Sequence, residues 1–274
     1  MGTSVRRIVR EFVVEGRGLH GGEHGTVRVR PGTAGAGIRI GRSGALVPLH
    51  PGLAEPEAVR CTALRLPGGA TVRTVEHLLA AVLGCGVRDV ELELDGPEVP
   101  ILDGSARPWV EALTDASEPG EEEGRAPTLA GPLRVRCGDA EYAAEPAAAA
   151  SLEVELALPR TWLGVQRVRW DGDAASFGRE IAPARTFALA EDVAGILAAG
   201  LARGGSLECA VVLGPDGPLG GPLRFPDEPV RHKLLDLVGD LALLGRLPAV
   251  RITARGTFHG GNLALASGLA ERLR

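Results

Sequence analysis

Side chains that can bind a metal or transfer protons recur at every fourth position of the segment 231–241. His232, Asp236 and Asp240 would share one strip of a helix there, because an α-helix turns about once every 3.6 residues. The opposite side carries leucines and a valine, which favours packing into a core. A His and an Asp one turn apart can bind the same divalent ion. The alternative is a solvated helix face with salt bridges, which this spacing alone does not exclude.

Lysine is used once in this chain. Lys233 lies beside the strip of His and Asp residues, and it is the only lysine among thirty lysine and arginine residues. An ammonium group is a compact charge with an adjustable pKa, whereas a guanidinium group is planar and permanently charged. The retention of lysine at this one position therefore indicates a functional role.

A second suggestive pair, Glu76 and His77, lies at the start of a helix predicted over 75–84. Thr74 is the expected N-cap and Gly84 the expected end, and apolar positions between them form a buried side. Beside a bound metal, the carboxylate could take a proton from a water molecule. The alternative is an exposed polar first turn, in which the helix dipole favours a Glu.

Two histidines and one carboxylate, with a fourth position left open, form a common ligand set of catalytic zinc. His77, His232 and Asp236 supply this set, one from the first half of the chain and two from the second. Glu76 would act as the base, and His259, in a later turn, would be a proton donor. The pattern makes a metallohydrolase one hypothesis beside the structural alternatives above, and the spacing does not show that the two halves meet.

Composition limits the class of protein. The 274 residues fit one large or two medium domains, and 45% hydrophobic residues allow a sizeable core. The net charge of −5 argues against a nucleic-acid binder. The start of the chain lacks a continuous apolar run, so neither a signal peptide nor a transmembrane segment is expected. Four cysteines without a CxxC pair predict neither a disulfide framework nor a structural zinc site. We expect a cytoplasmic protein.

Both halves of the chain show a similar plan of strands and helices. An acidic stretch with Pro and Gly at 115–127 is the expected linker between two domains. Before it we predict strands at 7–15, 26–30, 37–40, 58–66 and 87–94, and helices at 75–84 and 107–113. After it we predict strands at 133–137, 141–144, 152–158, 165–170, 207–213 and 250–254, and helices at 191–199, 231–241 and 263–274.

Several motifs resemble the signatures of one enzyme family. These are TVEHL at 74–78, PEVPILDGS at 97–105, ARTF at 184–187 and RHKLLDLVGD at 231–240. They are similar to those of LpxC, the zinc-dependent UDP-3-O-acyl-N-acetylglucosamine deacetylase family of lipid A biosynthesis. The segment GLHGG at 18–22 resembles the opening turn of that family. Because the motifs follow the same order over nearly the whole chain, the resemblance is specific.

The resemblance implies an α+β fold of two similar domains, each a β-sheet packed on helices, with the helices sandwiched between the sheets. The N-terminal domain would comprise residues 1–122 and the C-terminal domain residues 128–274. An apolar insert at about 193–213 would line the passage for the acyl chain. The active site would lie between the domains.

The resemblance also implies the metal site. The ligands would be His77, His232 and Asp236, holding one zinc ion per chain, and Fe²⁺ would fit the same ligands. Glu76 would be the general base of the committed deacetylation step of lipid A biosynthesis. By the same resemblance, His259 would stabilise charge and protonate the leaving group, and Asp240 would orient His259. Lys233 would add positive charge, and Thr186 would stabilise the oxyanion. Phe187 would contact the sugar, and Cys61 and His20 would line the site.

Two regions depart from the family pattern. LALPRT at 156–161 stands where members commonly have a Phe-Asn-His-Pro segment, and 255–261 differs around His259. Both changes touch expected contacts to the nucleotide and diphosphate. The expected substrate is a UDP-linked acylated N-acetylglucosamine, handled by a monomer without nucleic acid. The alternatives are a divergent zinc amidase acting on another N-acetylated sugar, and a non-catalytic binding protein on the same fold.

Overall fold

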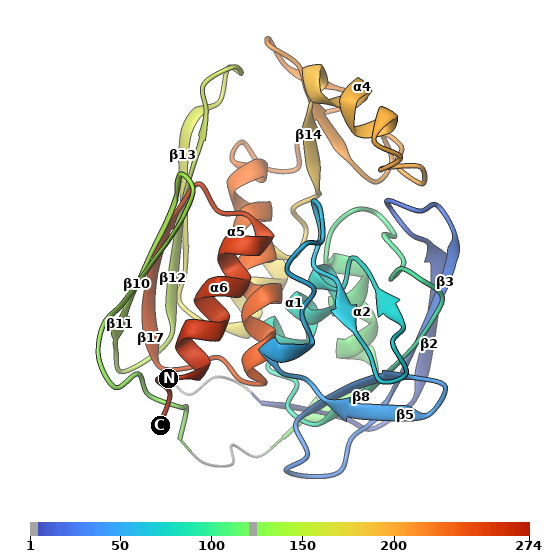
Figure 1. The fold of residues 1–274 in the computed structure, drawn as a ribbon, viewed down its shortest axis with the longest axis vertical. Helices are drawn as coiled ribbons and strands as arrows, with labels where there is room; N and C mark the ends of the chain where they lie inside the picture. Colours follow the sequence, from blue (N-terminus) through green and yellow to red (C-terminus); the bar gives the residue numbers. More distant parts are fainter. Residues whose placement is uncertain (1–4, 121–124) are drawn as a thin grey trace.

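Two five-stranded sheets form the outer layers of the molecule, and the long helices fill the space between them (Figure 1). The structure is a computed structural model that describes residues 5–120 and 125–274. The predicted boundary at residue 122 and part of the predicted linker therefore lie outside the described residues, as do residues 1–4. The predicted α+β architecture, with helices sandwiched between two sheets, is confirmed.

The first sheet has the order β2-β3-β8-β4-β5. Only the β8–β4 pair is parallel. Apolar and polar side chains alternate along β3, and the apolar face of the sheet packs on the helices. Val27 and Val29 are fully buried, whereas Arg28 between them is exposed. The strands are β2 (Phe12–Arg17), β3 (His24–Pro31), β4 (Ile38–Arg42), β5 (Ala45–Pro48) and β8 (Val90–Asp95).

The second sheet repeats this topology, with the order β10-β11-β17-β12-β13 and β17–β12 as its only parallel pair. Each sheet thus places its last strand in the centre, beside its third. This repeat explains the similar plan of the two halves, which share no obvious sequence repeat. The strands are β10 (Leu133–Cys137), β11 (Ala140–Pro146), β12 (Ser151–Leu158), β13 (Gly164–Trp170) and β17 (Val250–Arg255).

Four helices lie between the sheets: α1 (Glu76–Gly84), α2 (Arg107–Asp115), α5 (Glu228–Leu241) and α6 (His259–Ala270). Every residue of α1 is buried, and α5 is buried along nearly all of its length. α1 packs directly on α5, so the first and second halves of the chain meet along these two helices. The question that spacing left open, whether the two motifs come together, is answered by this contact.

A small subdomain, residues 187–219, projects beyond one end of the layers (Figure 1). It contains a three-stranded sheet of order β14-β15-β16 and one short helix. The predicted helix at 191–199 is confirmed as α4, but the predicted strand at 207–213 shortens to three residues. The elements are β14 (Phe187–Leu189), α4 (Ala190–Ala198), β15 (Val211–Leu213) and β16 (Pro218–Leu219).

Short elements complete the fold. They are the pair β1 (Arg6–Ile8) and β9 (Ser117–Pro119), the pair β6 (Leu64–Arg65) and β7 (Thr71–Val72), and the helical turns η1 (Pro51–Leu53), α3 (Ala174–Ser176), η2 (Phe177–Ile181) and η3 (Ala242–Leu244). Across residues 5–120 and 125–274, no helix is both long and apolar enough to cross a membrane.

Four local predictions are wrong. The predicted strand 58–66 is strand only at Leu64–Arg65, and the predicted strand 7–15 is broken into β1 and β2. Thr74 does not cap α1, since its backbone has a φ of 58° and its hydroxyl donates to the buried Glu98 at 2.6 Å. The last helix begins at His259 rather than at residue 263.

Candidate metal centre

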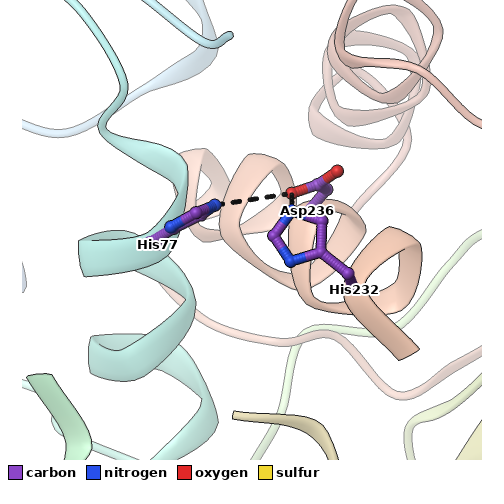
Figure 2. A group of neighbouring side chains, drawn as sticks. All are labelled: His77, His232 and Asp236. Atoms are coloured by element: carbon purple, nitrogen blue, oxygen red, sulfur yellow. Dashed lines mark ion pairs between the residues drawn. The ribbon is translucent and has the colours of Figure 1, made fainter. Parts of the chain in front are cut away.

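Three side chains from α1 and α5 converge in the buried interior between the two halves (Figure 2). The Nε2 atoms of His232 and His77 lie 3.3 Å and 3.9 Å from Oδ1 of Asp236. The two imidazole rings meet edge to face, with centroids 5.0 Å apart. His77 comes from the first turn of α1, while His232 and Asp236 are one turn apart on α5. Each offers one ligand atom, and these atoms all lie within 4.8 Å of one another.

Hydrogen bonds prepare the α5 residues to bind a cation. Nδ1 of His232 lies 3.0 Å from the carbonyl oxygen of Ala184. Because a carbonyl can only accept, Nδ1 carries the proton, and Nε2 keeps a free lone pair. Lys233 donates to Oδ2 of Asp236 at 2.8 Å, which leaves Oδ1 buried with no hydrogen-bond partner among the described residues. A buried unpartnered carboxylate oxygen is costly, and a cation would satisfy it.

The charges also fit a divalent cation. Burial, together with the neighbouring His232, lowers the pKa of His77 to about 3, so its imidazole is neutral and can bind metal. Burial also lowers the pKa of His232. For Asp236, burial disfavours the charged form, but His232 and Lys233 outweigh it and hold the pKa below its ordinary value. Two neutral imidazoles and one carboxylate are a donor set that suits zinc.

Glu76, the residue before His77, presents a buried carboxylate. Its Oε2 accepts the backbone N–H of Thr62 at 3.0 Å, and its Oε1 lies 3.8 Å from Nε2 of His259. Burial raises the pKa of Glu76 to about 8, against the opposing effect of His259. A carboxyl group whose pKa lies near neutrality can both accept and release a proton, which suits acid–base catalysis.

His259, at the start of α6, faces Glu76 with Nε2 and contacts Asp240 with Nδ1. Nδ1 of His259 lies 3.1 Å from Oδ2 of Asp240 and 3.2 Å from the Thr62 hydroxyl. Burial would lower the pKa of His259, but the carboxylates of Asp240 and Glu76 outweigh burial and raise it to about 9. The imidazole is therefore protonated at neutral pH and can act as a proton donor.

Asp240 is fully buried and surrounded by donors. Its Oδ1 accepts the Thr62 hydroxyl at 2.5 Å, and its Oδ2 accepts the amide of Asn262 at 2.8 Å. The Tyr142 hydroxyl donates to Oδ1 of Asn262 at 3.0 Å, which fixes the orientation of that amide. This network holds the Asp240 carboxylate toward His259.

The expected substrate-contacting residues lie on two sides of this centre. The Phe187 ring stands edge to face with His232, with centroids 6.2 Å apart, and Thr186 precedes it at the start of β14. His20 and Cys61 line a cavity of about 280 Å³ that is bounded by the turn after α4. Burial raises the pKa of Cys61 to about 12, so its thiol stays neutral.

Sequence reasoning missed four residues that position the site. Asn262 follows His259 by three residues, so helical spacing could have revealed it. Thr62 was assigned to a strand, and only its tertiary contacts disclose its role. Glu98 and Glu228 are carboxylates in Pro-containing segments, and their burial at 3% and 1% exposure was not visible from composition.

Comparison with known proteins shows the family to which this chain belongs. The family model for LpxC, described as UDP-3-O-acyl N-acetylglycosamine deacetylase, matches residues 5–271. A UDP-3-O-acyl-N-acetylglucosamine deacetylase of Synechocystis is 40% identical over 271 residues, covering 96% of this chain and 97% of the relative. The enzymes of that name from Phenylobacterium zucineum and Chlamydia abortus are 40% and 36% identical, covering 94% and 98% of this chain and 90% and 98% of their own lengths. The chain therefore belongs to the LpxC family of deacetylases.

Proposed function

We propose that this protein hydrolyses the acetamide of UDP-3-O-acyl-N-acetylglucosamine to the free amine and acetate, the committed step of lipid A biosynthesis. Membership of a deacetylase family supports the reaction type. The observation that carries the proposal is the convergence of Glu76 and His259 beside the His77, His232 and Asp236 cluster, because amide hydrolysis needs a base, an acid and a charge-stabilising centre. We also propose that the reaction takes place in the cytoplasm, which a nucleotide-linked substrate supports, and we expect one chain to suffice.

The metal in this proposal is zinc, one ion per chain, held by His77, His232 and Asp236. When bound there, zinc would polarise the acetamide carbonyl and make a water molecule more acidic. Fe²⁺ is a second metal that this donor set could accept. The buried, unpartnered Oδ1 of Asp236 and the free Nε2 lone pair of His232 support the assignment of these residues as ligands.

Proton transfer is proposed to begin at Glu76. The Thr62 N–H binds Oε2, while Oε1 lies 3.8 Å from Nε2 of His259. Oε1 would therefore accept the proton of the water molecule that attacks the acetamide carbon. A pKa raised to about 8 by burial makes the carboxylate a stronger base than an exposed one. The burial of Glu76 also strengthens its interaction with the reacting charge, because little water screens it.

Bond cleavage is proposed to depend on His259. The C–N bond breaks as the amine nitrogen takes the proton from Nε2 of His259, and acetate leaves with the oxygen supplied by water. Asp240 holds the ring through Nδ1 and stabilises its positive charge, so that the proton on Nε2 faces Glu76 and the reacting centre. Lys233, beside the metal ligands, and Thr186 would stabilise the negative charge that develops on the acetamide oxygen.

The substrate is proposed to lie between the two halves and the α4 subdomain, with Phe187 against the sugar. His20 and Cys61 would line the side nearest the acyl chain, where the turn after α4 closes the cavity of about 280 Å³. Residues 1–122 and 128–274 are proposed as the two domains, each contributing one sheet and its helices. This division is supported by the repeated strand order.

Another N-acetylated sugar remains the alternative substrate. The segment that departs from the family pattern, 156–161, contains Arg160, which pairs with Glu191 of α4 at 2.6 Å. The β12–β13 tip thus contacts the subdomain. The alternative is motivated by the departures from the family pattern at 156–161 and 255–261, which touch expected contacts to the nucleotide and diphosphate. A non-catalytic binding role is not favoured, because a binding protein needs neither Glu76 nor His259.

The decisive test is acetate release from UDP-3-O-acyl-N-acetylglucosamine by purified apo-protein titrated with zinc. Activity that rises to a maximum near one zinc per chain would support the substrate and the ligand set together. Zinc bound one-to-one without acetate release would reject this substrate, and the same assay with simple N-acetyl sugars would then identify the alternative. Activity that is independent of zinc would reject the proposed metal centre.

A further inference from the structure

Glu98 is a buried carboxylate that takes no part in the proposed chemistry. It lies in the loop between β8 and α2, and only 3% of it is exposed. Burying a carboxylate is costly unless hydrogen bonds or opposite charges compensate. No ion pair involving Glu98 is present among the described residues, so its partners must be neutral donors.

Those donors come from two segments that approach the active site. The backbone N–H groups of His20 and Gly21 donate to Oε1 and Oε2 of Glu98, each at 2.8 Å, and His20 also approaches Oε2 at 3.1 Å. The Thr74 hydroxyl donates to Oε1 at 2.6 Å. Hydrogen bonds to an ionised acceptor are about twice as strong as neutral ones. The carboxylate therefore fixes the turn that carries His20.

One glycine at the start of that turn and one in β3 lie against Glu98. A β-carbon at Gly18 would lie 2.4 Å from Oε2 of Glu98, and one at Gly25 would lie 2.1 Å from the Glu98 carbonyl oxygen. Both distances are shorter than any side chain can tolerate. The close approach of the backbone lets its N–H groups reach the carboxylate.

The opposite edge of the same turn binds the α4 subdomain. The backbone N–H groups of Arg203 and Gly204 donate to the carbonyl oxygens of His20 and Leu19 at 3.1 Å and 3.0 Å. The His20 ring lines the cavity beside this contact, and its Nδ1 is buried without a partner among the described residues. Glu98 is thus linked through one turn to both the cavity wall and the subdomain.

We propose that Glu98 is a positioning residue for substrate binding: its carboxylate fixes the His20 turn, and through that turn the position of the subdomain turn at 199–204. The inference rests on the proposed function, because substrate binding is its kinetic readout. Glu98 acts through the backbone of His20 and touches neither the substrate nor the metal ligands. Its loss should therefore weaken substrate binding more than it slows the chemical step.

Glu98→Gln is the informative variant. The amide oxygen can keep the contacts of Oε1 with His20 and Thr74. The amide NH₂ group would face the N–H of Gly21, and because both groups are donors, that hydrogen bond is lost. We expect KM to rise about 10-fold with kcat changed less than about 3-fold, on the scale of one hydrogen bond to a charged group. Glu23→Gln makes the same change at an exposed position of the same turn and should leave both constants unchanged.

A double-mutant cycle with His20→Ala separates positioning from a general structural role. If Glu98 acts through His20, Glu98→Gln should add little to the effect of His20→Ala on kcat/KM. Additive losses would overturn the proposal, as would a variant that loses zinc or changes kcat alone. Unchanged kinetics in Glu98→Gln would overturn it as well.

Amide hydrogen exchange tests the same geometry without relying on activity. In Glu98→Gln the amides of Gly21, Arg203 and Gly204 should exchange at least about 10-fold faster, while the helix amide of Leu79 stays protected. Unchanged exchange at the three turn amides would overturn the proposal even if KM rose. If wild-type protein releases no acetate, the proposed function fails, whereas the exchange result still decides whether Glu98 holds the turn.

Discussion

Gly239 of α5 lies against the backbone of Glu76 in α1. A β-carbon at Gly239 would be 2.1 Å from the carbonyl oxygen of Glu76 and 3.0 Å from its α-carbon. Only glycine therefore permits the two helices to approach this closely. The contact lies between the two sets of functional residues, since Glu76 precedes His77 and Gly239 lies between Asp236 and Asp240. Glycine at this position thus determines whether ligands from both halves can share one site.

Replacement of Gly239 by alanine should separate α1 from α5. Overpacking of this kind costs about 1–3 kcal/mol, which urea unfolding at equilibrium would measure. Zinc affinity should fall in parallel, because His77 moves away from His232 and Asp236. Gly195→Ala in α4 is the matched control, since a β-carbon there meets nothing within 4 Å. That variant should be neutral or more stable by up to about 1 kcal/mol. Equal stability of both variants would contradict the argument.

The helices that carry the candidate ligands were predictable because their signals are local, whereas the layered arrangement of the sheets was expected only from the family resemblance. The strip of His and Asp on α5 and the apolar stripe opposite it follow from helical spacing, and the motifs placed Glu76 and His77 on a second helix. The approach of the two helices depends on Gly239, whose role is invisible without the tertiary contact. Spacing could nominate the ligands but could not bring them together.

Two of the wrong predictions, the strand at 58–66 and the Thr74 cap, share a physical cause. Residues 58–66 alternate like a strand, yet the backbone N–H of Thr62 donates to the Glu76 side chain instead of to a neighbouring strand. Thr74 has the residue type of an N-cap, but its hydroxyl is taken by Glu98 and its φ is positive. In both places a buried carboxylate from a distant segment outweighs the local propensity, and one sequence window does not contain that information.

Glu76→Gln should separate catalysis from metal binding. The amide can still accept the N–H of Thr62, but it cannot take a proton from water. We expect turnover to fall by about 10²-fold or more while zinc remains bound one-to-one. Acetate release and metal analysis on the same preparation would measure both quantities. Glu111→Gln, on the exposed side of α2, should behave like wild type. Turnover that is unchanged in Glu76→Gln would remove this residue from the mechanism.

Loss of one ligand should abolish stoichiometric zinc binding. His232→Ala removes an Nε2 lone pair that the Ala184 carbonyl orients, and two ligands alone bind zinc weakly. Metal analysis after dialysis should give well below one zinc per chain. His24→Ala, at an exposed position that begins β3, should keep full zinc content. Chelation of the wild type should also lower its melting temperature, because bound metal stabilises the folded state alone. Full zinc content in His232→Ala would show that the ligand set is wrong.

Asn262 should matter for catalysis although it touches no reacting group. Its amide donates to Asp240 at 2.8 Å, and Asp240 in turn holds His259. Asn262→Ala removes a hydrogen bond to a charged group, so kcat should fall about 10-fold with KM little changed. Tyr142→Phe removes a hydroxyl that orients the amide and also contacts the backbone of Phe258, but it leaves the Asn262 amide bonded to Asp240, so the fall in kcat should be smaller. A larger fall in kcat for Tyr142→Phe than for Asn262→Ala would contradict the proposal that Asn262 acts on His259 through Asp240.

Stability at acid pH should depend on Glu228. Its carboxylate accepts N–H groups from the side chain and backbone of Arg185 and from the backbone of Arg224. Burial would raise its pKa, but Arg185 outweighs burial and holds the pKa below the ordinary value of 4.5. The unfolded chain therefore binds the proton first as pH falls, so this contribution is complete above pH 4.5 and is lost below it. Glu228→Gln should lower the free energy of unfolding at pH 7 by about 1–3 kcal/mol and flatten its decline below pH 4.5. Urea unfolding at a series of pH values would measure both effects, with Glu111→Gln as the exposed control. An acid slope as steep as that of wild type would show that another carboxylate is responsible.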